Sequence, residues 1–252
     1  MSFGVYVHYP WCMHHCPYCD FAVSTTRPEQ DRYTRAVLRE LELRAPAFDG
    51  LACATLYIGG GTPSLWAPAE IATVIGAIRR RLDMPASAEV TLEANPESVD
   101  RDRLSAWRDA GVNRVSIGVQ SLDAGVLAKL GRRHGVREAE EAVARALAVF
   151  DDVSVDLIYG ARRSTVETVR ADAERVAAMG VPHVSAYALT LDLEVLAEEV
   201  PLARLRRQGR LPLPSDDDVL AQSRALRAAL RAAGLRRYEI SNFARPGYES
   251  VH

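Results

Sequence analysis

The sequence predicts an α/β fold, an open barrel of six strand–helix units with parallel strands inside and helices outside. Short β-branched and aromatic runs alternate six times with amphipathic stretches. The run at residues 52–58 is almost continuously apolar, as is typical of a parallel strand covered on both faces. A closed TIM barrel would need eight units, so the count predicts a partial (β/α)6 TIM-like barrel.

The elements follow one another in regular order. We expect strands at residues 4–9, 52–58, 88–93, 114–119, 153–158 and 181–187. Helices are expected from Pro28 to about Pro46, over 71–82, near 100–110, over 124–150 with breaks at Gly131 and Gly135, and over 165–179. An irregular stretch follows, then a helix capped by Ser215 and ended by Gly234, and an extended segment at 238–241.

Two regions are expected on this basis. Residues 1–190 form the partial barrel, and residues 191–252 form the irregular segment, the final helix and the beginning of a C-terminal region. The irregular stretch contains Pro201, Pro212 and Pro214, which interrupt regular structure.

Composition excludes several classes of function. The 31 basic and 33 acidic residues give a net charge of −2, so we expect neither nucleic acid nor an anionic membrane as a partner. We expect no transmembrane segment, since no apolar run approaches ~18 residues, and no signal peptide, since the chain enters a strand at once. Clustered free cysteines favour a reducing cytoplasm.

Three of the four cysteines fall within eight positions, at Cys12, Cys16 and Cys19, with the spacing C-x3-C-x2-C. Three clustered thiols cannot all pair as disulfides, and Cys53 lies in an apolar strand, where we expect it to pack. A zinc site with one of the nearby histidines, His8, His14 or His15, is one possibility. An iron–sulfur cluster with one iron left open is the other.

Polar or glycine residues follow the other strands, as the cysteines follow the first. In parallel barrels these positions share one rim, where functional groups gather. They are Cys12, Gly60, Glu93, Gln120, Asp156 and Tyr187. The three glycines at 59–61 let a backbone approach a ligand closely, and no Gly-Lys-Ser/Thr follows them as in a phosphate loop. We expect structural roles for His134 and His183, and His8 is the better candidate for a ligand contact.

The cysteine spacing resembles the signature of radical S-adenosylmethionine (SAM) enzymes, and the rest of the chain resembles the HemN/HemW family in order. The segments that carry this resemblance are Tyr6-Val7-His8, Gly59-Gly60-Gly61-Thr62-Pro63, Leu92-Glu93-Ala94-Asn95-Pro96, Ser116-Ile117-Gly118-Val119-Gln120-Ser121, Val155-Asp156-Leu157-Ile158-Tyr159-Gly160 and Tyr238-Glu239-Ile240-Ser241-Asn242-Phe243-Ala244-Arg245-Pro246-Gly247-Tyr248.

The resemblance implies a 4Fe–4S cluster on Cys12, Cys16 and Cys19, with SAM on the open iron as the source of a 5′-deoxyadenosyl radical. It also implies a SAM pocket, with Tyr18 on the adenine side. The pocket residues would be Tyr6, Tyr18, Gly60, Gly61, Thr62, Glu93, Gln120, Arg132 and Asp156. It assigns no catalytic residue to this chain.

Two branches of that family differ at position 21. The coproporphyrinogen III oxidase branch carries a further cysteine there, whereas this chain has Phe21 and begins almost directly with its first strand. Both features resemble the haem chaperone branch, HemW. The resemblance therefore implies haem as cargo and its transfer to acceptor proteins, respiratory ones among them. The alternative is oxidative decarboxylation of coproporphyrinogen III in porphyrin biosynthesis, so whether the chain is an enzyme stays open.

Some segments depart from the family pattern. Residues Ala161-Arg162-Arg163 and Leu191-Asp192-Leu193-Glu194 replace its usual sequences near the fifth and sixth strands. The family continues beyond the motif that contains His252, so we expect the chain to be truncated at its C-terminus.

Overall fold

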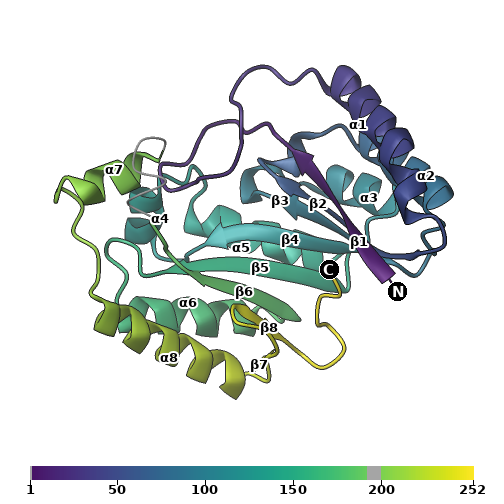
Figure 1. Ribbon diagram of the computed structural model, residues 1–252. Coiled ribbons are helices and arrows are strands. Elements are labelled where there is room, and N and C mark those ends of the chain that lie inside the picture. The colour runs from purple at the N-terminus through teal and green to yellow at the C-terminus, as the bar shows by residue number, and fades with distance from the viewer. Residues whose placement is uncertain (1, 192–199) are drawn as a thin grey trace.

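The computed structural model describes residues 2–191 and 200–252 (Figure 1). Six parallel strands lie side by side in chain order, which confirms the predicted open α/β barrel. They are β1 (Ser2–Tyr9), β2 (Ala52–Gly60), β3 (Glu89–Ala94), β4 (Arg114–Gln120), β5 (Asp152–Tyr159) and β6 (His183–Ala188). Their carboxyl ends therefore meet at one rim.

Helices cover the outer face of this sheet, as Figure 1 shows. They are α1 (Gln30–Arg44), α2 (Pro68–Arg81), α3 (Arg101–Asp109), α4 (Ala124–Leu130), α5 (Val136–Leu147) and α6 (Val166–Ala178). The predicted breaks at Gly131 and Gly135 separate α4 from α5, and Gly131 takes the left-handed conformation (φ 69°) that ends α4. Their apolar faces and the alternating strand residues that face them form one continuous core, in which Cys53 is fully buried as expected. The strand side chains that point into the barrel are instead largely polar, among them Thr91, Ser116 and Asp156.

The chain after β6 differs in part from the sequence expectation. A short helix, α7 (Pro201–Arg207), lies within the stretch predicted to be irregular, and Pro201 occupies its first turn, where no N–H is needed. The departure from the family pattern at Asp192–Glu194 lies outside the described residues. The predicted helix capped by Ser215 is present as α8 (Asp216–Ala232), where Ser215 and Asp218 form a reciprocal cap.

Two short antiparallel strands, β7 (Arg236–Arg237) and β8 (Asn242–Ala244), extend the sheet beyond β6. Tyr238–Ser241, predicted to be extended, instead connects these two strands. Its backbone turns because β8 must reverse direction to pair with β6, a long-range contact that local sequence does not report.

The last residues return to the start of the barrel strands, so that both termini lie close together in Figure 1. The hydroxyl of Ser250 and the amide of Val251 both donate to the Glu89 carboxylate, at 2.8 and 2.9 Å. The ring of His252 bonds to the Thr55 hydroxyl at 2.8 Å and stacks on Tyr57, with ring centroids 5.1 Å apart. These contacts close the end of the barrel opposite the cysteine loop.

Candidate functional site

A cavity of about 420 Å³ lies at the rim where the parallel strands end. All of the predicted site residues except Tyr6 line it: Cys12, Cys16, Tyr18, Cys19, Gly60, Gly61, Thr62, Glu93, Gln120, Arg132 and Asp156. Tyr6 is 51% exposed; its ring lies beside that of Tyr57, and its hydroxyl pairs with His8 Nδ1 at 3.1 Å. The topology of six parallel strands thus brings together residues from six separate parts of the chain.

Hydrogen bonds hold the cysteine loop, residues 10–24, both where its two ends meet and at its tip. The Cys12 amide donates to Ser24 O at 3.0 Å, and the Ser24 amide donates to Pro10 O at 2.7 Å, which joins the two ends. At the tip, His14 Nε2 contacts Gly131 O at 3.0 Å and the Leu202 amide donates to Pro17 O at 2.9 Å. The loop therefore rests on the junction of α4 with α5 and on α7.

The glycines after β2 serve a close approach between two backbone segments. The Gly61 amide donates to Tyr9 O at 2.7 Å, and a Cβ at Gly61 would lie 2.7 Å from Trp11 O. Gly60 has φ 111°, and its amide donates to Glu93 Oε2 at 3.1 Å. A larger residue at these positions would collide with the base of the cysteine loop, at Tyr9 and Trp11. The glycines therefore let the loop pack against β2.

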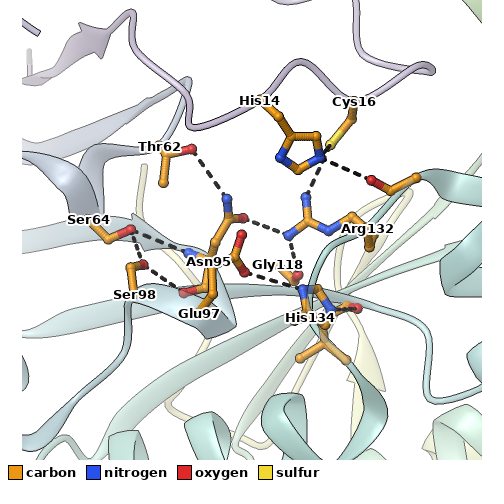
Figure 2. Close-up of polar contacts among 12 residues, drawn as sticks. His14, Cys16, Thr62, Ser64, Asn95, Glu97, Ser98, Gly118, Arg132 and His134 are labelled. Carbon is orange, nitrogen blue, oxygen red and sulfur yellow. Dashed lines mark hydrogen bonds and ion pairs between the residues drawn. The ribbon is translucent and has the colours of Figure 1, made fainter. Parts of the chain in front are cut away.

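Two of the three thiols receive hydrogen-bond donors from one polar network, and Figure 2 shows the part of it around Cys16. The Thr62 hydroxyl donates to Cys12 Sγ at 3.5 Å, and Arg132 NH1 donates to Cys16 Sγ at 3.6 Å. Asn95 joins these two donors, because its amide nitrogen donates to Thr62 Oγ1 at 3.3 Å and its oxygen accepts from Arg132 NH2 at 2.7 Å. Asn95 also lines the cavity.

Tyr18 lies between cysteine ligand candidates and two apolar clusters. It packs against one cluster around Val126 and Leu130 and against another around Val200 and Leu202. Burial raises the pKa of its phenol, so the ring stays neutral. This position anchors the cysteine loop to the rim and leaves the edge of the ring on the cavity.

The carboxylates of Glu93 and Asp156 lie inside the barrel and line the same cavity as the cysteines. Glu93 accepts from the Tyr57 hydroxyl at 2.8 Å, and Asp156 accepts from the Ser116 hydroxyl at 2.9 Å. Burial, and next the Asp156 carboxylate, raise the pKa of Glu93 to about 7, while burial raises the pKa of Asp156 to about 6. Both groups can accept from a cationic amine or from hydroxyls of a ligand in the cavity.

Gln120 ends β4 in the left-handed conformation, with φ 67°. A non-glycine residue rarely adopts it, and such positions are found at functional sites. The next turn is held by Asp172 of α6, which accepts from the Ser121 hydroxyl at 2.6 Å and the Leu122 amide at 2.9 Å. This pairing keeps the Gln120 side chain at the cavity.

The histidines are mostly engaged with the protein itself. His134 Nε2 contacts Val119 O at 3.0 Å, and His183 bonds to the hydroxyls of Ser154 and Tyr238, each at 2.8 Å, consistent with the structural roles expected for both. His8, expected nearer to a ligand, has both ring nitrogens paired, with the Tyr6 hydroxyl and with Ala22 O.

Sequence reasoning did not single out Asn95 or Tyr57 as site residues. Asn95 stands in the quoted Glu93-Ala94-Asn95-Pro96 segment, where its place directly after a strand was the available signal. Tyr57 lies within an apolar strand and carried no such signal, because only the fold shows that its hydroxyl reaches Glu93.

The three clustered thiols leave two kinds of centre open by sequence, a zinc site and an iron–sulfur cluster. Within residues 2–191 and 200–252, no three histidine, cysteine or carboxylate side chains converge as a preformed metal site. The three thiols nonetheless line one cavity, where, besides burial, Cys16 contributes to the raised pKa of Cys12, and Cys16 and Cys12 contribute to that of Cys19. Burial raises the pKa of Cys12 and Cys19, while Thr62 and Arg132 offset it at Cys12. These residues suit a cluster held by three thiolates, with donors already aimed at two of the sulfurs.

Comparison with known proteins relates the whole chain to one superfamily. The model of the Radical SAM superfamily matches residues 6–176. Heme chaperone HemW of Mycobacterium tuberculosis is 42% identical over 258 residues, which cover 99% of this chain and 64% of that protein. Heme chaperone HemW of Escherichia coli is 37% identical over 255 residues, with the same two coverages. The chain thus spans 64% of the length of these relatives, which is less than two thirds.

A solved structure also has a similar fold. Coproporphyrinogen III oxidase (HemN) from Escherichia coli, a radical SAM enzyme, superposes with a TM-score of 0.84 over 98% of this chain and 56% of that one, at 28% sequence identity. The open barrel and the rim described above are therefore similar to those of a solved member.

Proposed function

Because the chain belongs to the radical SAM superfamily, we propose that Cys12, Cys16 and Cys19 hold a 4Fe–4S cluster and that the adjoining cavity takes S-adenosyl-L-methionine. When bound, this pair supplies one-electron reductive chemistry at the sulfonium. The observation that carries the proposal is the shared cavity, which all three thiols line together with Thr62 and Arg132.

Individual residues take distinct parts in holding the cofactor. Glu93, fixed by Tyr57 and the Gly60 amide, would accept from the amine of the methionyl group. Asp156 would accept from hydroxyls of the cofactor, and the Gln120 amide could accept from or donate to its polar groups. Gly60 and Gly61 let the base of the cysteine loop pack against β2 and line the cavity beside it. Tyr18 would lie on the adenine side, and Tyr6, which lies outside the cavity, would contribute only through its neighbours His8 and Tyr57.

We propose that the protein is a haem chaperone that binds haem and delivers it to haem-requiring proteins. The similarity to heme chaperones HemW over 99% of the chain supports this function. Phe21 lines the cavity and is 55% exposed. The coproporphyrinogen III oxidase branch has a further cysteine at this position, so Phe21 favours the chaperone branch. The four cysteines are free, which is typical of a protein in a reducing cytoplasm. None of the described helices has the length and apolar character that a membrane span requires.

The test compares chaperone and oxidase chemistry on one preparation. The chain is reconstituted anaerobically with iron and sulfide, titrated with haem, and separately incubated with coproporphyrinogen III, SAM and a reductant. We expect a saturable haem absorption band and no decarboxylation. Decarboxylation coupled to 5′-deoxyadenosine would support the oxidase function, which the structural similarity to HemN makes the second candidate.

A further inference from the structure

We propose that Asn95 is a positioning residue that directs one hydrogen-bond donor onto Cys12 and another onto Cys16. The proposal rests on the cluster assigned to these cysteines above. Asn95 touches neither sulfur, and it acts through Thr62 and Arg132, which do. Its place is directly after β3, on the rim that faces the cysteine loop (Figure 2).

The backbone of Asn95 is held on both sides. Its amide donates to the Ser64 hydroxyl at 3.4 Å, and its carbonyl accepts from the Ser98 hydroxyl at 2.7 Å and from the Ser98 amide at 2.9 Å. The two serine hydroxyls are paired with each other at 2.6 Å. Pro96 keeps the preceding residue extended, as its ψ of 145° shows. The side chain therefore projects from a fixed point.

The chemistry of the partners sets the orientation of the Asn95 amide. A guanidinium group only donates, so the oxygen of Asn95 must face Arg132 NH2, which it meets at 2.7 Å. The nitrogen then faces the other way and donates to Thr62 Oγ1 at 3.3 Å. The reverse orientation would set two donors against each other at Arg132.

This orientation decides what the Thr62 hydroxyl does. A hydroxyl has one hydrogen to donate, and because its oxygen already accepts from Asn95, that hydrogen is free for Cys12 Sγ at 3.5 Å. The chain of donors thus runs in one direction, from Arg132 through Asn95 and Thr62 to the sulfur of Cys12.

The contact between Asn95 and Arg132 also orients the guanidinium group of Arg132 toward the sulfur of Cys16. Its NH2 group is shared between Asn95 Oδ1 and Gly118 O, at 2.7 and 3.0 Å, which leaves NH1 directed at Cys16 Sγ. His14 Nε2 also lies 3.6 Å from this sulfur, but it contacts Gly131 O at the shorter distance of 3.0 Å. Arg132 is therefore the principal donor to Cys16.

Donors to ligand sulfurs stabilise the more negative, reduced state of an iron–sulfur cluster and so raise its reduction potential. The function of Asn95 is then to set the potential of the cluster through two sulfurs at once. This differs from a packing role, which would not depend on whether residue 62 can donate a hydrogen bond.

Substitution of Asn95 by Asp separates the two roles. Aspartate has the same shape and still accepts from Arg132, but it cannot donate to Thr62, so the Thr62 hydroxyl turns to donate to the carboxylate instead of Cys12. Thr62→Val removes the hydroxyl without changing the shape, and Thr62→Ser is the matched control that keeps it. The readout is the midpoint potential of the reconstituted cluster by spectroscopic redox titration.

We expect Thr62→Val to shift the potential to more negative values in the wild-type chain and Thr62→Ser to leave it unchanged. In the Asn95→Asp background, Thr62→Val should cause no further shift, because the hydroxyl no longer donates to Cys12. The charge introduced by the aspartate is common to both members of that second comparison and cancels. Equal shifts in both backgrounds would overturn the proposal.

A second measurement needs no cluster. In the metal-free chain, denaturant unfolding of Asn95→Ala, Thr62→Val and the double variant should give losses that are less than additive, because both single changes break one hydrogen bond. Additive losses would contradict the assigned network. Failure of the wild-type chain to assemble any cluster would instead count against the proposed function, so the two failures are distinguishable.

Discussion

The phenol of Tyr57 donates a hydrogen bond of 2.8 Å to Oε1 of Glu93 inside the barrel. The other carboxylate oxygen accepts from the Gly60 amide at 3.1 Å, so Glu93 is held from β2 on both of its oxygens. His252 stacks on the same tyrosine from the opposite end of the barrel. One aromatic ring therefore lies between the C-terminal residues and the carboxylate that faces the cavity.

The raised pKa of Glu93 predicts a dependence of stability on pH. Between its ordinary value of 4.5 and about 7, the folded chain keeps a proton on Glu93 that the unfolded chain has released. The contribution of Glu93 to the free energy of unfolding therefore falls as pH rises through this window and levels off above it. Glu93→Gln should remove this contribution, a decrease of about 1–3 kcal/mol in the free energy of unfolding across the window. Urea unfolding of the metal-free chain at several pH values measures it.

Asp152, Asp156 and Asp172, whose pKa values burial raises to about 6, contribute in the same direction, and His183, whose pKa burial lowers to about 3, contributes in the opposite direction. All four remain in the Glu93→Gln variant, so the stability of the wild-type chain relative to the variant should fall as pH rises from 4.5 to about 7. An identical slope in both chains would mean that Glu93 is not protonated in the folded state at low pH.

Gly61→Ala should loosen the cysteine loop. Its new Cβ would lie 2.7 Å from Trp11 O and 3.0 Å from Tyr9 O, both backbone atoms that cannot turn aside. We expect a loss of stability of roughly 1–3 kcal/mol and reduced iron uptake. Gly135→Ala is the matched control, because nothing lies within 4 Å of its added methyl group. Comparable losses at both positions would point to a general effect of replacing glycine.

Asp172 should be needed for the turn that carries Gln120. Its replacement by Ala leaves the buried Ser121 hydroxyl and the Leu122 amide without acceptors, at a cost of roughly 2–4 kcal/mol. Asp172→Asn should cost less, since the amide oxygen still accepts from Leu122 and the hydroxyl can turn to accept. Denaturant unfolding ranks the three chains, and an Asn variant as unstable as the Ala variant would contradict this reading.

The sequence predicts the strands and most of the rim well, for a physical reason. The strand residues that face the helices are apolar, as Leu56 and Ile58 are, and in a barrel each strand must end at the same rim. The order of elements alone therefore places Glu93, Gln120 and Asp156 beside the cysteine loop, where the structure has them.

Long-range contacts set the features that the sequence did not predict. The turn at Tyr238–Ser241 exists because β8 pairs with β6 in the opposite direction, and α7 is held in part by the bond from Leu202 to Pro17 O. The glycines after β2 illustrate a subtler case. Their use was foreseen as close approach to a ligand, whereas at Gly61 the close neighbour is the backbone of Trp11.

The most direct test of the central claim is an iron and sulfide analysis of the anaerobically reconstituted chain and its single Cys→Ala variants. We predict about four irons and four sulfides per wild-type chain. The cluster should be lost on replacing Cys12, Cys16 or Cys19 and retained on replacing Cys53, which is buried in the core. Stoichiometric zinc without sulfide, or a cluster that survives replacement of any of the three loop cysteines, would contradict the account.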